Sequence, residues 1–355
     1  MDEEGEMSLD VINALFQQGF MAMGVGTVEG GSDISFTDSL LVIREISRVD
    51  PAVGLFLCSH NHLVLQAVCQ HGTSEQKLNY LPKLCSDTVG CFCLSESSTS
   101  ARAPFSVHCT ATRDEEKGGF FLKGNKQYIS NAKEAGVFLV IATTNPEKPE
   151  EGLSCFIVER ETNGLTVGRN LNKTGVRATS TCEVSLQNVF VPESQVLGPL
   201  GGWKELTENI LSGNKIAIAA QLLGLAEGAF DAAVPFLIEK ENAEQKRLKD
   251  FQGIRFRAAE LASEIESVRA LVLAAALLRS RSLSVKKEAA IAKYKASLTA
   301  EKVASACIEF FGGLGCSKDF PAEKYLRDAK MGALYGGTNN LQMETIFDSI
   351  EEEYV

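Results

Sequence analysis

The first quarter of the chain repeats apolar residues at helical spacing. Four segments place an apolar side chain at every third or fourth position, which gathers these side chains on one face of an α-helix: 9–19, 38–49, 52–70 and 74–84. Asp50 and Pro51 suit the N-cap and the first helical position of the third segment. The pattern therefore predicts a helical domain over residues 1–89, shorter than a complete bundle.

From about residue 90 the pattern changes to alternation of apolar and polar residues. Alternation with a period of two is typical of β-strands, and six segments follow it between glycine-rich or charged turns: 89–94, 120–124, 127–130, 137–143, 154–159 and 182–191. We therefore expect a middle β domain over residues 90–200.

The helical period returns near residue 203 and continues to the end of the chain. It predicts four long helices, over 206–239, 251–280, 286–311 and the last segment, in which Pro321 begins a helix through Met331 and a further helix covers 341–350. Alanine-rich stretches within them allow close helix packing. The chain is thus predicted to be an α+β protein, in which a four-helix bundle over residues 201–355 follows the helical and β domains.

Composition excludes several classes of function. The formal net charge is -11 and no basic stripe is present, which argues against nucleic acid as a partner. No uncharged apolar run approaches the roughly 18 residues of a membrane helix, so no membrane span is expected. The acidic N-terminus, MDEEGEMSLD, resembles neither a secretory signal nor an Arg-rich transit peptide.

The metal-binding residue types are scattered along the chain. Ten cysteines and four histidines occur without a CxxC pair, so we expect no metal site. Reduced thiols in an intracellular compartment are the favoured interpretation of the cysteines.

Two glycine pairs, Gly312-Gly313 and Gly336-Gly337, bracket a polar segment near the C-terminus. Glycine inside a helix costs about 1 kcal/mol relative to alanine, so paired glycines indicate turns or a close backbone approach. Thr338 and the two asparagines after it suit the N-cap of a following helix. Such a loop is either a simple turn or a site where the N–H groups of a helix N-terminus hold a phosphate.

The wider pattern resembles a known family. GGLG at 312–315, KYLRDAK at 324–330 and YGGTNNLQ at 335–342 are similar to the C-terminal signature of the acyl-CoA dehydrogenases, and HGTSEQKLNYLP at 71–82 also matches. The resemblance extends over essentially the whole chain and is strongest to the short/branched-chain branch. It implies FAD as cofactor and α,β-dehydrogenation of an acyl-CoA in fatty-acid or branched-chain amino-acid catabolism.

One position departs from the family where the chemistry is done. The resemblance implies a glutamate that removes the α-proton at position 336, which is Gly336 here, and the alternative location on the helix after the β domain holds Asn214. A positioned base is worth about 10²–10⁴-fold in rate. Glu344 is a weaker candidate for a substitute base. The resemblance also implies substrate contacts at Ser212, Lys215 and Arg102.

The resemblance implies flavin contacts in four separate segments. They are Leu94, Ser95, Tyr128, Ile129, Ser130, Phe251, Gln252, Glu309, Gly312, Gly313, Gly337, Thr338 and Asn340. Two segments are altered. Side chains replace the family's glycines after Glu96, and the Arg and Phe that precede the Asp-Phe-Gln motif are missing from 240–247. Loss of a bidentate phosphate contact is expected to weaken FAD binding.

Two hypotheses therefore remain. The first is a flavoenzyme of impaired activity that passes electrons to an electron-transferring flavoprotein, as a homotetramer in the mitochondrial matrix. The second is a catalytically silent paralogue that binds acyl-CoA or serves as a scaffold or regulatory subunit. A related flavin oxidase with another carboxylate is a third and less favoured interpretation.

Overall fold

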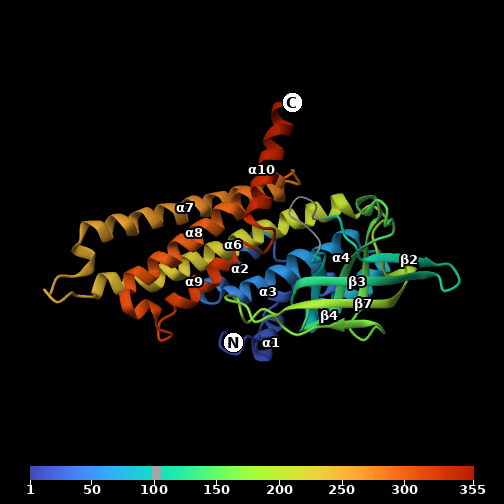
Figure 1. Ribbon diagram of the computed structural model, residues 1–355, viewed down its shortest axis with the longest axis horizontal. Helices are drawn as coiled ribbons and strands as arrows, with labels where there is room; N and C mark the ends of the chain where they lie inside the picture. Colours follow the sequence, from blue (N-terminus) through green and yellow to red (C-terminus); the bar gives the residue numbers. More distant parts are fainter. Residues whose placement is uncertain (98–104) are drawn as a thin grey trace. The chain divides into compact units, whose positions relative to one another are not determined.

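The computed structural model describes residues 1–97 and 105–355 (Figure 1). Contacts divide the chain into two compact units. The first comprises Met1–Ser39, Phe56–Asn172 and Arg177–Asn214, and the second comprises Leu40–Leu55, Lys173–Val176 and Lys215–Val355. The two units do not divide the chain at residues 89 and 200, so the boundaries of the three expected domains stay a prediction.

The N-terminal segment is helical, as the apolar spacing predicts. Its elements are α1 (Leu9–Gln17), η1 (Phe20–Ala22), η2 (Thr27–Glu29), α2 (Phe36–Val49), α3 (Pro51–Ser59), η3 (His60–Leu65), α4 (Gln66–His71) and α5 (Ser74–Ser86). The single helix expected over 52–70 is interrupted by η3, which is a π-helical turn. Asn61 explains the interruption in part, because its side chain accepts from Met23 N (3.0 Å) and donates to Phe20 O (3.0 Å).

The first unit also contains an eight-stranded sheet. Its strands are β1 (Val89–Cys93), β2 (Thr110–Asp114), β3 (Gly119–Ser130), β4 (Ala135–Thr143), β5 (Leu153–Glu159), β6 (Leu165–Val167), β7 (Thr181–Pro192) and β8 (Val196–Leu197), with turns η4 (Pro149–Gly152) and η5 (Glu193–Gln195). The strand order is β6-β7-β3-β2-β4-β5-β8, and β1 pairs with β4 in parallel. The two strands expected over 120–130 form one strand, β3, whose register shifts between Lys126 and Ile129.

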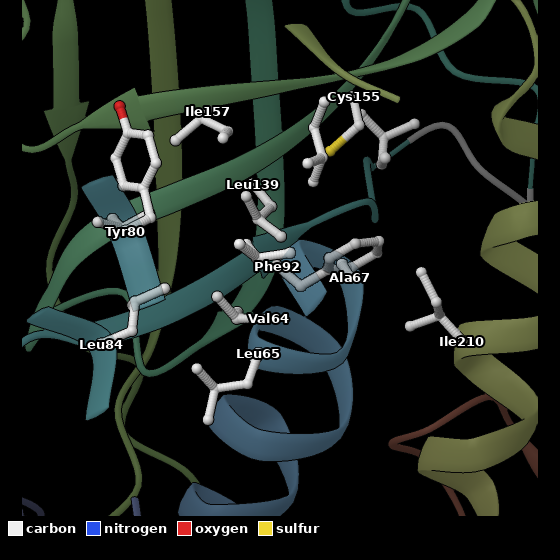
Figure 2. Packing of buried hydrophobic residues seen from close by; sticks show 14 of the residues in the cluster. Val64, Leu65, Ala67, Tyr80, Leu84, Phe92, Leu139, Cys155, Ile157 and Ile210 are labelled. Carbon is white, nitrogen blue, oxygen red and sulfur yellow. The ribbon is translucent and has the colours of Figure 1, made fainter. Parts of the chain in front are cut away.

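Strands β1, β4 and β5 are buried on both faces, and alternate residues of β4 belong to two different cores. Leu139 and its neighbours two residues away pack with apolar residues of η3, α4, α5 and the start of α6, whereas Phe138 and Val140 belong to a second cluster formed by the strands and the segments next to them. Figure 2 shows the first cluster, in which Val64 of η3 and Leu84 of α5 lie near Leu139. Covered on both faces, β4 is a nearly continuous apolar run rather than an alternation of apolar and polar residues.

The second unit is helical. Its elements are the parts of α2 and α3 from Leu40 to Leu55, the part of α6 (Trp203–Glu239) from Lys215 onward, η6 (Leu248–Asp250), α7 (Gln252–Ser280), α8 (Lys286–Phe311), η7 (Gly312–Cys316), α9 (Ala322–Met331) and α10 (Asn339–Tyr354). α8 contacts α7, α9 and α10, and α7 and α8 run side by side (Figure 1). The α+β order of helices, sheet and helices expected from the sequence is confirmed.

Two helical stretches bear on the expectation that the chain has no membrane span. Pro51–His71 and Trp203–Glu239 are long and apolar enough to cross a bilayer by length and composition alone. In each, 83% of the apolar window is buried inside the protein. Core helices account for both, since helices that are apolar on all sides are also found in the core of large proteins.

The ten cysteines are free thiols. Cys316 is exposed, Cys69 is half-buried and the others are buried. Burial raises the pKa of the Cys85 thiol and of the Cys307 thiol, each to about 12. The buried cysteines therefore behave as small apolar side chains.

Candidate functional site

The turn between α9 and α10 has the geometry of an anion-binding loop. Gly336 (φ +64°) and Gly337 (φ +85°) both occupy the left-handed region that favours glycine. Thr338 is the N-cap of α10, and its hydroxyl accepts a hydrogen bond from Leu341 N (3.2 Å). The turn therefore ends at a capped helix N-terminus, as the sequence predicts.

Two buried side chains hold the turn by its carbonyl groups. Lys293 Nζ donates to Gly337 O (2.8 Å), and Gln342 Nε2 donates to Gly337 O (3.0 Å) and to Gly336 O (3.3 Å). Both side chains are fully buried. In a trans peptide the N–H group is directed opposite to the carbonyl. The N–H groups of Gly337 and Thr338 are therefore directed away from Lys293 and Gln342.

Lys293 is an unusual residue for a helical core. Its Nζ also donates to Asn339 Oδ1 (3.2 Å), which in turn accepts a hydrogen bond from Ser297 Oγ (2.9 Å). Burial, reinforced by the positive charge of Lys215, lowers the pKa of Lys293 to about 7. Sequence reasoning missed Lys293. The available signal was a lysine on the alanine-rich buried stripe of α8.

The side chain of Ile218 lies beside Gly336, the position of the expected base. A Cβ atom built on Gly336 would lie 2.3 Å from Ile218 Cδ1. Real Cβ atoms do not approach so closely, so no side chain fits at 336 unless Ile218 moves. At this turn the chain thus holds no carboxylate, and a side chain at 336 would have to displace the terminal methyl of Ile218 and adopt a left-handed φ.

The alternative base position and two of the predicted substrate contacts lie along α6. Asn214 is buried, and its Oδ1 has no hydrogen-bond partner among the described residues. Ser212 Oγ donates to Glu208 O (2.8 Å), so its hydroxyl proton is used within the helix. Lys215 is the residue at which α6 enters the second unit. Arg102 lies outside the described residues.

In the first unit, Ser95 lies next to the end of β3. Ser95 is exposed and Leu94 is half-buried, and Ser95 O accepts a hydrogen bond from Gln127 N (2.9 Å). Tyr128, one residue further, has a left-handed φ of +60° and is 63% exposed. The bond from Gln127 to Ser95 therefore connects two segments, each of which carries predicted flavin contacts.

The next two residues complete the Tyr-Ile-Ser segment. Ile129 is buried in the strand cluster, whereas Ser130 is half-buried. The buried Ile129 fixes β3 at the point where Tyr128 is directed outward. An exposed aromatic ring beside an exposed hydroxyl suits stacking and hydrogen bonding with a planar heterocycle.

A buried ion pair anchors the Ser95 loop. Lys126 Nζ donates to Glu96 Oε1 (2.6 Å) and to Leu94 O (3.0 Å), and both charged side chains are buried. Glu96 also accepts from His108 N (2.7 Å) and Cys109 N (3.0 Å). Sequence reasoning missed this pair as well, because the two residues are 30 positions apart.

A cavity of the second unit brings two predicted adenosine contacts together. Its volume is about 510 Å³, and its lining includes Phe236, Lys240, Glu241, Asn242, Glu309 and Gly312. Glu241 pairs with Arg247 (3.7 Å), so it is already partly compensated. Gly312 and Gly313 have no atom within 4 Å of a built Cβ, so packing inside this chain does not explain them.

The remaining predicted contacts lie beside this cavity and on the turn. Phe251 is 39% exposed and Gln252 is exposed, where η6 meets α7. Gly253, which follows them, lines the cavity. Asn340 is exposed in the first turn of α10.

Comparison with known proteins decides the family. Models of the acyl-CoA dehydrogenase N-terminal, middle and C-terminal domains match residues 1–88, 91–189 and 201–351, respectively. The chain belongs to the acyl-CoA dehydrogenase family. The recognition made from the sequence motifs is thereby confirmed.

Individual relatives agree over the full length of the chain. The short/branched chain specific acyl-CoA dehydrogenase of Rattus norvegicus, a mitochondrial protein, is 42% identical over 100% of this chain and 81% of its own length. A probable short/branched chain enzyme of Dictyostelium discoideum is 41% identical over 100% of this chain and 85% of its own. The structure of butyryl-CoA dehydrogenase from Megasphaera elsdenii is similar with a TM-score of 0.95, at 30% identity over 99% and 92% of the two chains.

Acyl-CoA dehydrogenases depend on FAD, and the residues of this chain fit that cofactor in three places. The outward N–H groups of the 336–338 turn, backed by Lys293, suit phosphates. The cavity beside Glu309 is large enough for an adenosine, and the Glu309 carboxylate is an acceptor for hydroxyl groups. Ser95 and Tyr128 suit the ring system. Asn242, in the segment where the family has an arginine, supplies no cation.

Proposed function

We propose that this acyl-CoA dehydrogenase family member binds FAD and short/branched-chain acyl-CoA and dehydrogenates its substrate only slowly. The similarity to short/branched-chain relatives at 42% and 41% identity supports the substrate class. The observation that carries the proposal is Gly336, with Ile218 Cδ1 at 2.3 Å from its built Cβ. That geometry leaves no carboxylate to accept the α-proton.

The reaction divides into a proton transfer and a hydride transfer. FAD, when bound, accepts the hydride from the β-carbon of the acyl chain. The α-proton must pass to a base, and neither Gly336 nor Asn214 can accept it. Glu344 of α10 stays the weaker candidate for a substitute base. With solvent as the acceptor, we expect the rate to be lower by about 10²–10⁴-fold than with a positioned carboxylate.

The other residues retain binding roles in this proposal. The N–H groups of Gly337 and Thr338 hold phosphates, Glu309 and Gly312 bound the adenosine cavity, and Ser95 and Tyr128 contact the ring. Ser212, Lys215 and Arg102 stay predicted acyl-CoA contacts. We also propose a homotetramer in the mitochondrial matrix with an electron-transferring flavoprotein as electron acceptor, which the relatives' names support only as to compartment.

A catalytically silent paralogue is the second candidate. The absence of a carboxylate both at Gly336 and at Asn214 favours it, because neither position can accept the α-proton. Such a protein binds acyl-CoA, or serves as a scaffold or regulatory subunit, without turnover.

One anaerobic titration separates the two. The purified chain is examined for flavin absorbance and then mixed with 2-methylbutyryl-CoA, with a long straight-chain acyl-CoA as the control for substrate class. Slow bleaching of the flavin by the branched substrate supports the slow enzyme. A spectrum that shifts on acyl-CoA binding but does not bleach supports the silent paralogue. A protein that binds neither FAD nor acyl-CoA contradicts both.

A further inference from the structure

Two buried lysines hold the two loops to which flavin contacts are assigned. Lys126 donates to Leu94 O beside Ser95, and Lys293 donates to Gly337 O in the 336–338 turn. The two lysines differ in whether a carboxylate compensates the charge. Lys126 is paired with the Glu96 carboxylate at 2.6 Å. Lys293 contacts a carbonyl and the amide of Asn339, and none of the salt bridges among the described residues involves it.

The groups that face Lys293 make its positive charge unfavourable. α10 faces it with the uncharged amide of Asn339, and Ser297 on its own helix contacts the same amide. The charged side chain that acts on it is Lys215 of α6, which repels it. Its pKa of about 7 follows from this setting, so near neutral pH the amine is only partly protonated.

The turn itself separates Lys293 from the outward N–H groups. Because the carbonyls of Gly336 and Gly337 are directed at Lys293 and Gln342, an anion bound by the N–H groups lies on the opposite side of the same peptides. Gln342 Oε1 is buried and has no hydrogen-bond partner among the described residues, so the turn keeps an unused acceptor. A negative charge at the N–H groups stabilises the ammonium form of Lys293 across this single layer of backbone.

We propose that Lys293 is a positioning residue that supplies the counter-charge of the Gly336–Asn340 turn, and that binding of a phosphate-bearing ligand there is coupled to uptake of a proton by Lys293. The proposal rests on the proposed binding of FAD at this turn. It adds a role that the flavin contacts themselves do not require.

Linkage gives the expected size of the effect. At pH 8 a group with a pKa near 7 is about one-tenth protonated, so a ligand that fully charges it takes up about 0.9 proton. Above pH 7 the ligand's affinity then falls about tenfold for each pH unit. A lysine that only supports the fold produces neither effect.

The test is isothermal titration calorimetry on the full-length, flavin-free chain. FAD, ADP and riboflavin are titrated at pH 8 in two buffers of different ionisation enthalpy, such as Tris and TAPS, and the difference in heat gives the protons taken up. FAD and ADP are expected to take up close to one proton and riboflavin, which lacks phosphate, none. Repeating the titrations from pH 7 to 9 gives the slope of affinity against pH.

Three variants make the assignment specific. Lys293→Met is expected to bind FAD more weakly, with no proton uptake and no pH slope. Lys293→Arg, which stays charged, is expected to bind without pH dependence and more tightly than Lys293→Met. Lys295→Met, an exposed position on the same helix, is expected to behave like the wild type.

Several results overturn the inference. The first is that FAD binds to the wild type without proton uptake. The second is that Lys293→Met with FAD, or the wild type with riboflavin, takes up as many protons as the wild type does with FAD. The third is that the chain binds neither FAD nor ADP. If Lys293→Met does not fold, the wild-type proton count and Lys293→Arg still decide. FAD binding without proton uptake contradicts only this inference. The proposed function requires FAD binding and acyl-CoA turnover, and these titrations do not measure turnover.

Discussion

Ile218 Cδ1 lies 2.3 Å from the point that a Cβ atom on Gly336 would occupy. Restoring the family's glutamate at 336 therefore displaces the terminal methyl of Ile218. The variant Gly336→Glu alone is expected to reduce its flavin less than tenfold faster than the wild type, because the new side chain clashes and adopts an unfavourable φ. Gly336→Glu combined with Ile218→Ala is expected to gain about 10²-fold in the rate, since a base then has room.

Stopped-flow measurement of anaerobic flavin reduction by 2-methylbutyryl-CoA checks this prediction. The matched control is Gly336→Gln with Ile218→Ala, which has the same shape but no carboxylate. Equal rates for the glutamate and glutamine double variants would show that the missing base is not what limits turnover.

Lys293 is predicted to make stability depend on pH. Its pKa is about 7 in the folded chain against 10.5 as the ordinary value, so between these pH values the unfolded chain binds the proton that the folded chain lacks. The free energy of unfolding should therefore gain up to about 1.4 kcal/mol per pH unit from this group as pH rises above 7. Urea unfolding at pH 7, 8 and 9 should show this slope in the wild type and in Lys295→Met, and a smaller slope in Lys293→Met.

The Glu96–Lys126 pair is predicted to be costly to break. Replacing Glu96 by alanine leaves a buried ammonium group without its partner, and the free energy of unfolding should fall by about 3–5 kcal/mol. Adding Lys126→Met should recover part of the loss. The exposed pair of Lys83 and Glu159 (2.7 Å) is the control, and Lys83→Met should cost less than about 1 kcal/mol in the same urea titration.

His60 is predicted to lower stability in acid. Its Nε2 contacts Met21 O and Leu84 O, both at 3.0 Å, and its Nδ1 accepts from Gly90 N at 3.0 Å. Burial lowers the pKa of His60 to about 4, below the ordinary 6.5. Because the unfolded chain takes up a proton first, stability should fall by up to about 1.4 kcal/mol per pH unit between 6.5 and 4.

Unfolding of His60→Gln against pH tests this prediction. The amide keeps a donor and an acceptor but does not titrate, so the acid slope should decrease. His108→Gln is the control, since the His108 side chain is 67% exposed. An unchanged slope in His60→Gln would assign the acid sensitivity to other groups.

The fold was predictable where one apolar period continues over many residues. The segment expected over 286–311 coincides with α8, and that over 251–280 differs from α7 by one residue, because alanine and leucine repeat along both. β2 was missed, since Thr110–Asp114 is a polar strand with little apolar alternation. The π-helical turn η3 was missed because Asn61 is held by Met23 and Phe20, which lie far from it in sequence.

The candidate site was predictable only in its outline. The glycine turn and its capping Thr338 are local features, and local spacing indicates them. The roles of Lys293 and Ile218 depend on helices that are distant in sequence, since the contact of Lys293 with Gly337 joins residues 44 positions apart. Whether the predicted contacts bind flavin stays a prediction.

The distribution of thiols makes the folded chain suitable for labelling at one position. Cys316 is exposed in η7, a turn that begins at Gly312 of the 510 Å³ cavity, whereas Cys69 is half-buried and the other cysteines are buried. A maleimide dye should therefore react first at Cys316 in the native chain. Its fluorescence would then report occupancy of the neighbouring cavity without any reliance on the colour of a flavin.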